Sequence, residues 1–184
     1  NYIKFCPERG GVITNWVSDG KEILYFDEKR FMDKTKSIRG GIPILFPICG
    51  NLNTSISVFG IDYLQLTQHG FARDLRWQYS FNENEKSLCL FLNESKKTKK
   101  YYPFDFELRI EITLKVNYLE FEITIFNKTD IAMPINFGLH PYFNVSDFKN
   151  LEFIDNPLNC QNQEKNIISN TLDELKNINL GVDL

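Results

Sequence analysis

The chain has 184 residues, of which 42% are hydrophobic and 24% are charged, with a net charge of −3. This is ordinary globular composition, and it excludes a disordered acidic tail, a collagen and a coiled coil. A nucleic-acid binder usually carries a basic excess, and 21 basic against 24 acidic residues give none. The length suits one hydrophobic core, so we expect a single domain over residues 1–184.

The pattern of hydrophobic residues predicts strands along most of the chain, because apolar and polar residues alternate with a period of two. In chain order these strands are residues 2–5, 12–17, 23–26, 77–81, 87–92, 106–116, 119–127 and 133–137. Residues 106–116 and 119–127 are the best defined, and the turn residues Asn117 and Tyr118 between them indicate an antiparallel hairpin. One short helix is expected at residues 172–176, where Thr171 and Glu174 have capping-box spacing. Many strands in series without alternating helices favour an all-β sandwich or barrel.

Two polar stretches are interpreted as surface connections. Residues 93–100 carry four lysines, at positions 96, 97, 99 and 100. A nucleic-acid patch would interleave aromatic residues with them, whereas Tyr101 and Tyr102 come only afterwards, so a solvated turn is favoured. The second stretch, residues 156–170, is rich in Asn and Gln.

The distribution of cysteines and apolar runs bears on compartment and cofactors. The four cysteines, Cys6, Cys49, Cys89 and Cys160, form no close pairs, which favours reduced thiols and argues against structural zinc. No apolar run is long enough to span a bilayer, and no signal peptide opens the chain. We therefore expect a cytoplasmic protein without a membrane partner.

The candidate catalytic residues are the chain's two histidines, His69 and His140. A lone histidine is more often structural than catalytic. However, Gly70 follows His69 and Pro141 follows His140, and glycine allows close backbone approach while proline fixes a loop. Because binding residues concentrate on rigidly held loops, both a structural and a functional role stay open for each.

The third unusual segment is Arg39-Gly40-Gly41-Ile42-Pro43. It fits a turn before a buried edge strand, with Arg39 reaching solvent. It also fits a guanidinium held over a pocket for an oxygen-rich ligand. The segment lacks the spacing and the Lys-Ser/Thr of a phosphate-binding loop.

Aromatic residues near these segments are candidate walls for an apolar ligand face. Core packing is favoured for Phe46, Trp77 and Phe143. Tyr142 follows His140 by two, so in an extended chain it shares that side and is a candidate binding residue.

Taken in order, three segments resemble the aldose 1-epimerase (galactose mutarotase-like) superfamily, and its hexose-6-phosphate 1-epimerase branch in particular. The segments are Arg39-Gly-Gly-Ile-Pro, Gln68-His69-Gly-Phe-Ala-Arg73 and Gly138-Leu-His140-Pro-Tyr-Phe. The resemblance implies a large antiparallel β-sandwich. It also implies an isomerase that interconverts the α and β anomers of a sugar, with a sugar or sugar phosphate as partner and no metal or organic cofactor.

The resemblance also assigns roles to individual residues. His140 would be the general acid at the ring oxygen, a role that suits an imidazole, and His69 would hydrogen-bond the same region of the sugar. Arg39 and Arg73 would bind substrate oxygens or a phosphate dianion. Asp183, in Gly181-Val182-Asp183, corresponds to a sugar-binding aspartate of the family.

One expected group has no counterpart here, the family's general-base glutamate near the end of the domain. Glu174 lies too early and in a capping position, so we expect a domain that lacks its closing strands. Three alternatives remain: a mutarotase for unphosphorylated aldoses, a non-catalytic carbohydrate-binding module, and a sandwich that recognises protein partners. The sugar, the anomer preference and the oligomeric state cannot be read from the sequence.

Overall fold

The computed structural model describes residues 1–146, 159–162 and 167–170. The chain divides into two compact units, Asn1–Asn144 and Val145–Leu184. The expectation of a single domain over residues 1–184 stays a prediction. Within the described residues, no helix has both the length and the apolar character needed to cross a membrane.

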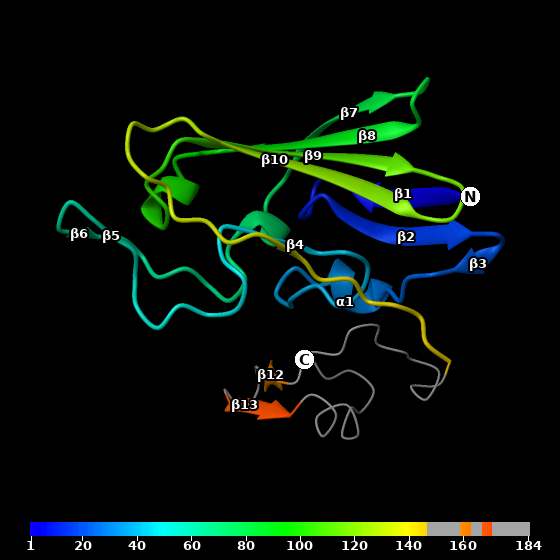
Figure 1. Cartoon of the computed structure of the whole chain (residues 1–184), viewed down its shortest axis with the longest axis horizontal. Helices are drawn as coiled ribbons and strands as arrows, with labels where there is room; N and C mark the ends of the chain where they lie inside the picture. Colours follow the sequence, from blue (N-terminus) through cyan, green and yellow to red (C-terminus); the bar gives the residue numbers. More distant parts are fainter. Residues whose placement is uncertain (147–158, 163–166, 171–184) are drawn as a thin grey trace. The chain divides into compact units, whose positions relative to one another are not determined.

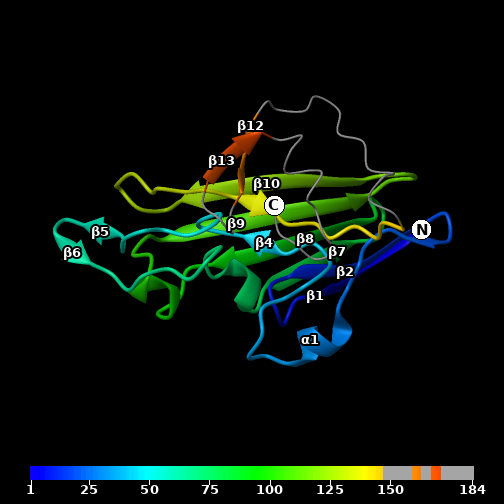
Figure 2. The ribbon, with the colours of Figure 1, turned by 90° about the horizontal axis from the view of Figure 1, so that it is seen from below.

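The first unit is built on two antiparallel sheets (Figures 1 and 2). The three-stranded sheet has the order β1 (Tyr2–Cys6), β2 (Val12–Ser18), β3 (Lys21–Glu22). The four-stranded sheet has the order β10 (Leu119–Asn127), β9 (Phe106–Leu114), β8 (Ser87–Asn93), β7 (Gln78–Asn82). Two short pairs lie outside these sheets, β4 (Ile44–Leu45) with β11 (Gly138–Leu139) and β5 (Ser57–Val58) with β6 (Ile61–Asp62).

The core of this unit follows from the alternation along its strands. On β9, Phe106, Leu108, Ile110 and Ile112 are each at most 1% exposed, because every second side chain points to the same face of a strand. They form one buried cluster with Ile13 of β2 and with residues of the other elements. Burial of apolar surface between the two sheets therefore stabilises the sandwich, and the predicted all-β fold class is confirmed.

Most of the predicted strands are confirmed, and their ends shift by no more than two residues. The antiparallel hairpin over residues 106–127 is confirmed, and the structure adds its register, with Leu119 opposite Leu114 and Asn127 opposite Phe106. The core interpretation is confirmed for Phe46 and Trp77, which are 0% and 1% exposed, and is wrong for Phe143, which is 54% exposed.

Two predicted strands are wrong. In residues 23–26 only isolated bridges form, from Leu24 to Phe143 and from Phe26 to Gly40, because the neighbouring chain meets this stretch at single residues. Residues 133–137 form no strand. Pro134 has no N–H to donate to a ladder, and the paired segment β11 begins only at Gly138.

Helical elements are short in the described residues. The α-helix α1 (Glu28–Met32) begins after Asp27, whose side chain accepts a hydrogen bond from the Arg30 N–H; an aspartate at this position is a recognised N-cap that hydrophobic periodicity does not register. The 3₁₀ turns η1 (Ala72–Asp74) and η2 (Thr98–Lys100) follow. η2 lies in the lysine-rich turn, and all four of its lysines are exposed.

The described part of the second unit is a hairpin of β12 (Asn159–Asn162) and β13 (Ile167–Asn170), paired antiparallel. The stretch interpreted as a surface connection, residues 156–170, therefore contains a strand pair that the sequence analysis did not predict. Strand pairing uses backbone N–H and C=O groups, so polar side chains do not prevent it. The helix predicted at residues 172–176 lies outside the described residues.

Candidate functional site

Residues 41–50 form the segment that brings the three sequence motifs together. On one side, the His140 N–H donates to the Pro43 carbonyl over 2.9 Å, and the Tyr142 N–H donates to the Gly41 carbonyl over 2.9 Å. On the other side, the His69 N–H donates to the Gly50 carbonyl over 2.7 Å. Segments that are far apart in the sequence are thus held on either side of one short stretch of chain.

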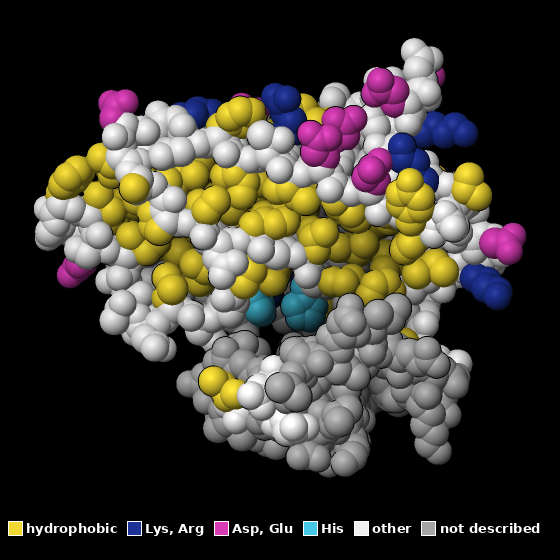
Figure 3. Space-filling model, in the orientation of Figure 1, with side chains coloured by type: hydrophobic (Ala, Val, Ile, Leu, Met, Phe, Trp, Pro, Cys, Tyr) yellow, Lys and Arg dark blue, Asp and Glu magenta, His cyan; other side chains and the backbone are white. Residues whose placement is uncertain are grey.

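The side chains of the two histidines lie close together in this arrangement. Their ring centroids are 5.8 Å apart and their planes are inclined by 76°. Both side chains are half-buried, and Figure 3 shows histidine side chains at the surface beside a broad apolar face. Two imidazoles that are reachable from solvent and this close can act on neighbouring atoms of one small ligand.

The backbone around His69 determines which of its ring nitrogens carries a proton. The residue has a positive φ of 65°, a conformation uncommon outside glycine. In this turn the Gly50 N–H donates to His69 Nδ1 over 2.9 Å. Because Nδ1 accepts this bond, a neutral His69 carries its proton on Nε2. The structure therefore presents His69 as a hydrogen-bond donor through Nε2.

Tyr142 packs against His140 rather than standing apart from it. The two rings are stacked, with centroids 4.9 Å apart and planes 22° from parallel. Residues i and i+2 of extended chain share a side, which is the relation that the sequence predicts for this pair. The phenol ring thus limits the orientations open to the imidazole of His140.

The two candidate arginines have different surroundings. Arg39 is half-buried, and its carbonyl accepts from the Asp27 N–H over 3.0 Å, which closes the loop that contains α1. The Arg73 side chain is only 16% exposed. Its Nη2 donates to the Gln68 carbonyl over 2.8 Å, and its Nε lies 3.8 Å from the Asp74 carboxylate. Arg73 therefore spans the turn that carries His69. Asp183 lies outside the described residues.

Cys49 is a neighbour of this site that the sequence analysis did not identify. A Cβ added at Gly138 would lie 2.8 Å from the Cys49 sulfur, so this thiol packs directly against the glycine that begins the His140 segment. Burial raises the pKa of the Cys49 thiol, which keeps it protonated near neutral pH. No motif in the sequence marks a lone cysteine as part of a site.

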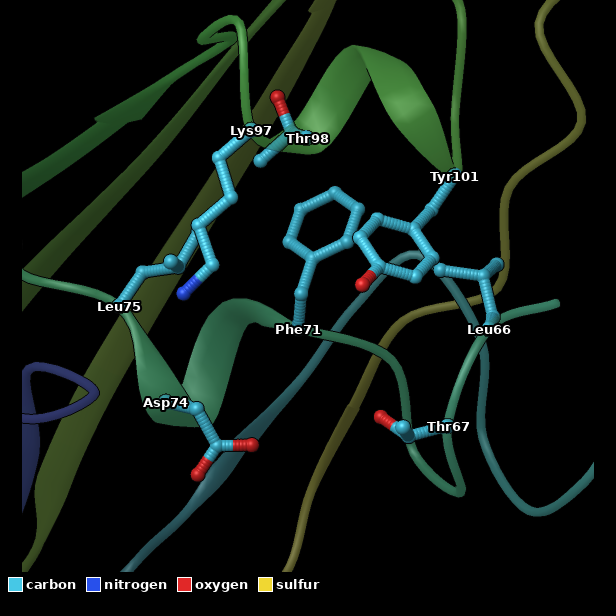
Figure 4. Close-up of a pocket in the computed structure, with 8 residues that line it drawn as sticks. All are labelled: Leu66, Thr67, Phe71, Asp74, Leu75, Lys97, Thr98 and Tyr101. Carbon is cyan, nitrogen blue, oxygen red and sulfur yellow. The ribbon is translucent and has the colours of Figure 1, made fainter. Parts of the chain in front are cut away.

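A separate pocket of about 170 Å³ lies between the His69–Arg73 segment and the lysine-rich turn (Figure 4). Phe71 and Tyr101 contribute aromatic rings, and Lys97 and Asp74 contribute opposite charges. Neither histidine lines it. In the part of the chain that the structure describes, no cluster of His, Cys, Asp and Glu is suited to hold a metal ion.

Comparison with known proteins gives a consistent result. The sequence profile of the family described as aldose 1-epimerase matches residues 5–177. A Cenchrus ciliaris protein named "Putative glucose-6-phosphate 1-epimerase" is 30% identical over 167 residues, covering 80% of this chain and 47% of that protein.

Solved structures agree with the sequence matches. The Slr1438 protein from Synechocystis sp. PCC 6803 is 38% identical with a TM-score of 0.85, over 91% of this chain and 59% of that one. A galactose mutarotase related enzyme from Lactobacillus acidophilus is 28% identical with a TM-score of 0.66, over 82% and 48% of the two chains. The chain spans about half the length of the curated relatives it matches.

Proposed function

Because the chain belongs to the aldose 1-epimerase family, we propose that the protein interconverts the α and β anomers of a hexose, with hexose 6-phosphate as the preferred substrate. The observation that carries this proposal is the pair of imidazoles, His69 and His140, with ring centroids 5.8 Å apart. The phosphorylated substrate is favoured by the name of the relative from Cenchrus ciliaris and by Arg39 and Arg73.

In the proposed reaction, His140 is the general acid at the ring oxygen, and His69 donates a hydrogen bond in the same region of the sugar. His140, as an imidazolium, donates its proton to the ring oxygen while a base takes the proton of the C1 hydroxyl. The bond between C1 and the ring oxygen breaks, and C1 becomes an aldehyde. After rotation about the C1–C2 bond, the ring oxygen attacks the other face of the aldehyde and both protons return.

The fixed tautomer of His69 supports this division. Protonation of Nδ1 would cost the hydrogen bond that this atom accepts from Gly50, so His69 is better suited to donate from Nε2 than to cycle between charge states. The acid role then falls to His140. The group that receives the C1 proton is not assigned among the described residues, and Asp183 remains a proposed sugar contact.

The experiment that tests this function is anomer exchange of glucose 6-phosphate, followed by NMR at neutral pH on the intact gene product, with glucose as the control sugar. We expect acceleration well above the spontaneous rate for the phosphosugar and little for glucose. Equal acceleration of both sugars would support the mutarotase for unphosphorylated aldoses. Binding without acceleration would support the carbohydrate-binding module and contradict the enzyme.

Replacement of Arg73 by alanine tests the proposed contact with phosphate. We expect kcat/KM for glucose 6-phosphate to fall by roughly 10- to 100-fold, the effect of losing one charged hydrogen bond, with a smaller effect on glucose. Arg73 also spans the His69 turn. If only that structural role were lost, kcat/KM would fall equally for both sugars. Arg76→Ala, at an exposed position of the same segment, is the matched control and should leave both rates unchanged.

A further inference from the structure

The turn between β1 and β2 contacts both arginine-bearing segments of the proposed site. It consists of residues 7–11, and it contains Arg9, whose side chain reaches into the loop of residues 27–39. This loop holds α1 and ends at Arg39. Its two ends are joined by the hydrogen bond from the Asp27 N–H to the Arg39 carbonyl.

Arg9 binds the middle of this loop through its backbone. Its guanidinium donates to the carbonyl oxygens of Phe31 and Lys36, and Nη1 lies 3.5 Å from the carbonyl oxygen of Asp33. Phe31 lies in the last turn of α1, where carbonyls lack partners within the helix, and Lys36 lies in no helix or strand. A planar fork with five N–H donors can satisfy several at once, whereas a lysine ammonium is a single point of attachment.

A series of ring contacts connects Arg9 with the residue that follows Arg39. The Arg9 guanidinium lies 5.0 Å from the centroid of the Phe31 ring. The Phe31 ring in turn packs on the Phe26 ring, with centroids 5.0 Å apart. Phe26 forms a bridge with Gly40, the residue directly after Arg39. Arg9 is therefore linked to the backbone beside Arg39 by a short series of direct contacts.

The same turn also contacts residues 73–77, which begin at Arg73. The Gly10 N–H donates to the Leu75 carbonyl over 2.7 Å, and the Trp77 N–H donates to the Pro7 carbonyl over 2.7 Å. Gly10 has a φ of +78°, and a Cβ there would lie 2.3 Å from the Arg73 carbonyl oxygen. Backbone thus packs on backbone at this point, which leaves little freedom between the turn and Arg73.

We propose that Arg9 is a positioning residue that sets the separation of Arg39 and Arg73, and thereby the affinity of the site for an anionic sugar. The inference rests on the proposed function, because it takes these two arginines as substrate contacts. Arg9 itself touches no substrate in this proposal. Its effect is to hold the Arg39 loop against a turn that is already fixed to Arg73, so that both guanidinium groups reach one ligand.

The test measures binding and turnover separately for the parent protein, Arg9→Ala, Arg9→Lys and the control Arg76→Ala. In Arg9→Ala we expect KM and the dissociation constant for glucose 6-phosphate to rise about tenfold or more, with kcat within threefold and glucose affected less. Arg9→Lys keeps the positive charge but loses the planar fork of N–H donors, so we expect it not to restore the affinity. Arg76→Ala should behave as the parent.

The results separate this inference from the proposed function. A parent that binds glucose 6-phosphate but does not accelerate exchange refutes the enzyme, and the dissociation constants still test Arg9. Unchanged affinity in Arg9→Ala, full rescue by Arg9→Lys, or an equal loss for glucose would each overturn the positioning role, as would a parent that binds neither sugar. Should Arg9→Ala fail to fold by circular dichroism, the comparison of Arg9→Lys with the parent decides.

Discussion

Replacing His140 with alanine is expected to lower kcat for anomer exchange by about 10²-fold or more, the range for loss of a general acid. The physical reason is that sugar ring opening leaves negative charge on the ring oxygen unless a proton arrives there. His140 is held in place by its N–H bond to the Pro43 carbonyl and by its stacking on Tyr142, as the proposed acid role requires. The measurement is NMR exchange of glucose 6-phosphate, corrected for the spontaneous rate.

His140→Gln provides the matched comparison. Glutamine keeps polar atoms and some bulk at this position but does not transfer a proton near neutral pH. We therefore expect kcat to fall as far in His140→Gln as in His140→Ala. Titration of each variant with glucose 6-phosphate, followed by NMR, checks that the site still binds. A loss below threefold in either variant would remove His140 from the acid role.

Replacing Gly70 with alanine is expected to lower the free energy of unfolding by about 3 kcal/mol or more, which is at the high end for single substitutions. Gly70 has a φ of +73°, and a Cβ there would lie 2.2 Å from the Phe46 carbonyl oxygen. That carbonyl accepts hydrogen bonds from the N–H groups of Phe71 and Ala72. The clash therefore falls on backbone that joins the His69 segment to the core.

Gly20→Ala is the control for backbone strain alone. Gly20 has the same φ of +73°, and a Cβ there would meet nothing within 4 Å. This substitution should lower the free energy of unfolding by only about 1–2 kcal/mol, the cost of placing an L-residue in the left-handed region. Urea denaturation measures both variants, and an equal loss in the two would show that the contact with Phe46 contributes nothing.

Local signals in the sequence predict the sheets but not every boundary. Alternation from Phe106 to Asn127 is enough to predict β9 and β10 as an antiparallel hairpin, because each strand buries one face. It fails at residues 133–137, where Pro134 lacks the donor that a ladder needs. It also misses the hairpin of β12 and β13, whose sequences do not alternate between apolar and polar residues.

The candidate site is only partly predictable in the same way. His69, His140, Arg39 and Arg73 stand out through the order of three motifs, which a family resemblance interprets. No local sequence pattern predicts the hydrogen bond from Arg73 to the Gln68 carbonyl. The same holds for the hydrogen bonds from Arg9 to the carbonyls of the loop. Phe143, expected in the core, is exposed because apolar character alone does not determine which side of an irregular segment faces inward.

The sequence by itself therefore determined the fold class, the main antiparallel hairpin and the two histidines that are candidates for acid–base chemistry. Alternation and glycine or proline context act over a few neighbouring residues, so they can be read directly. Only the tertiary structure decided that His69 and His140 meet, which nitrogen of His69 accepts the Gly50 N–H, and how the turn of residues 7–11 connects the two arginines. These depend on backbone hydrogen bonds between segments far apart in the chain, whose partners are chosen when the whole core packs.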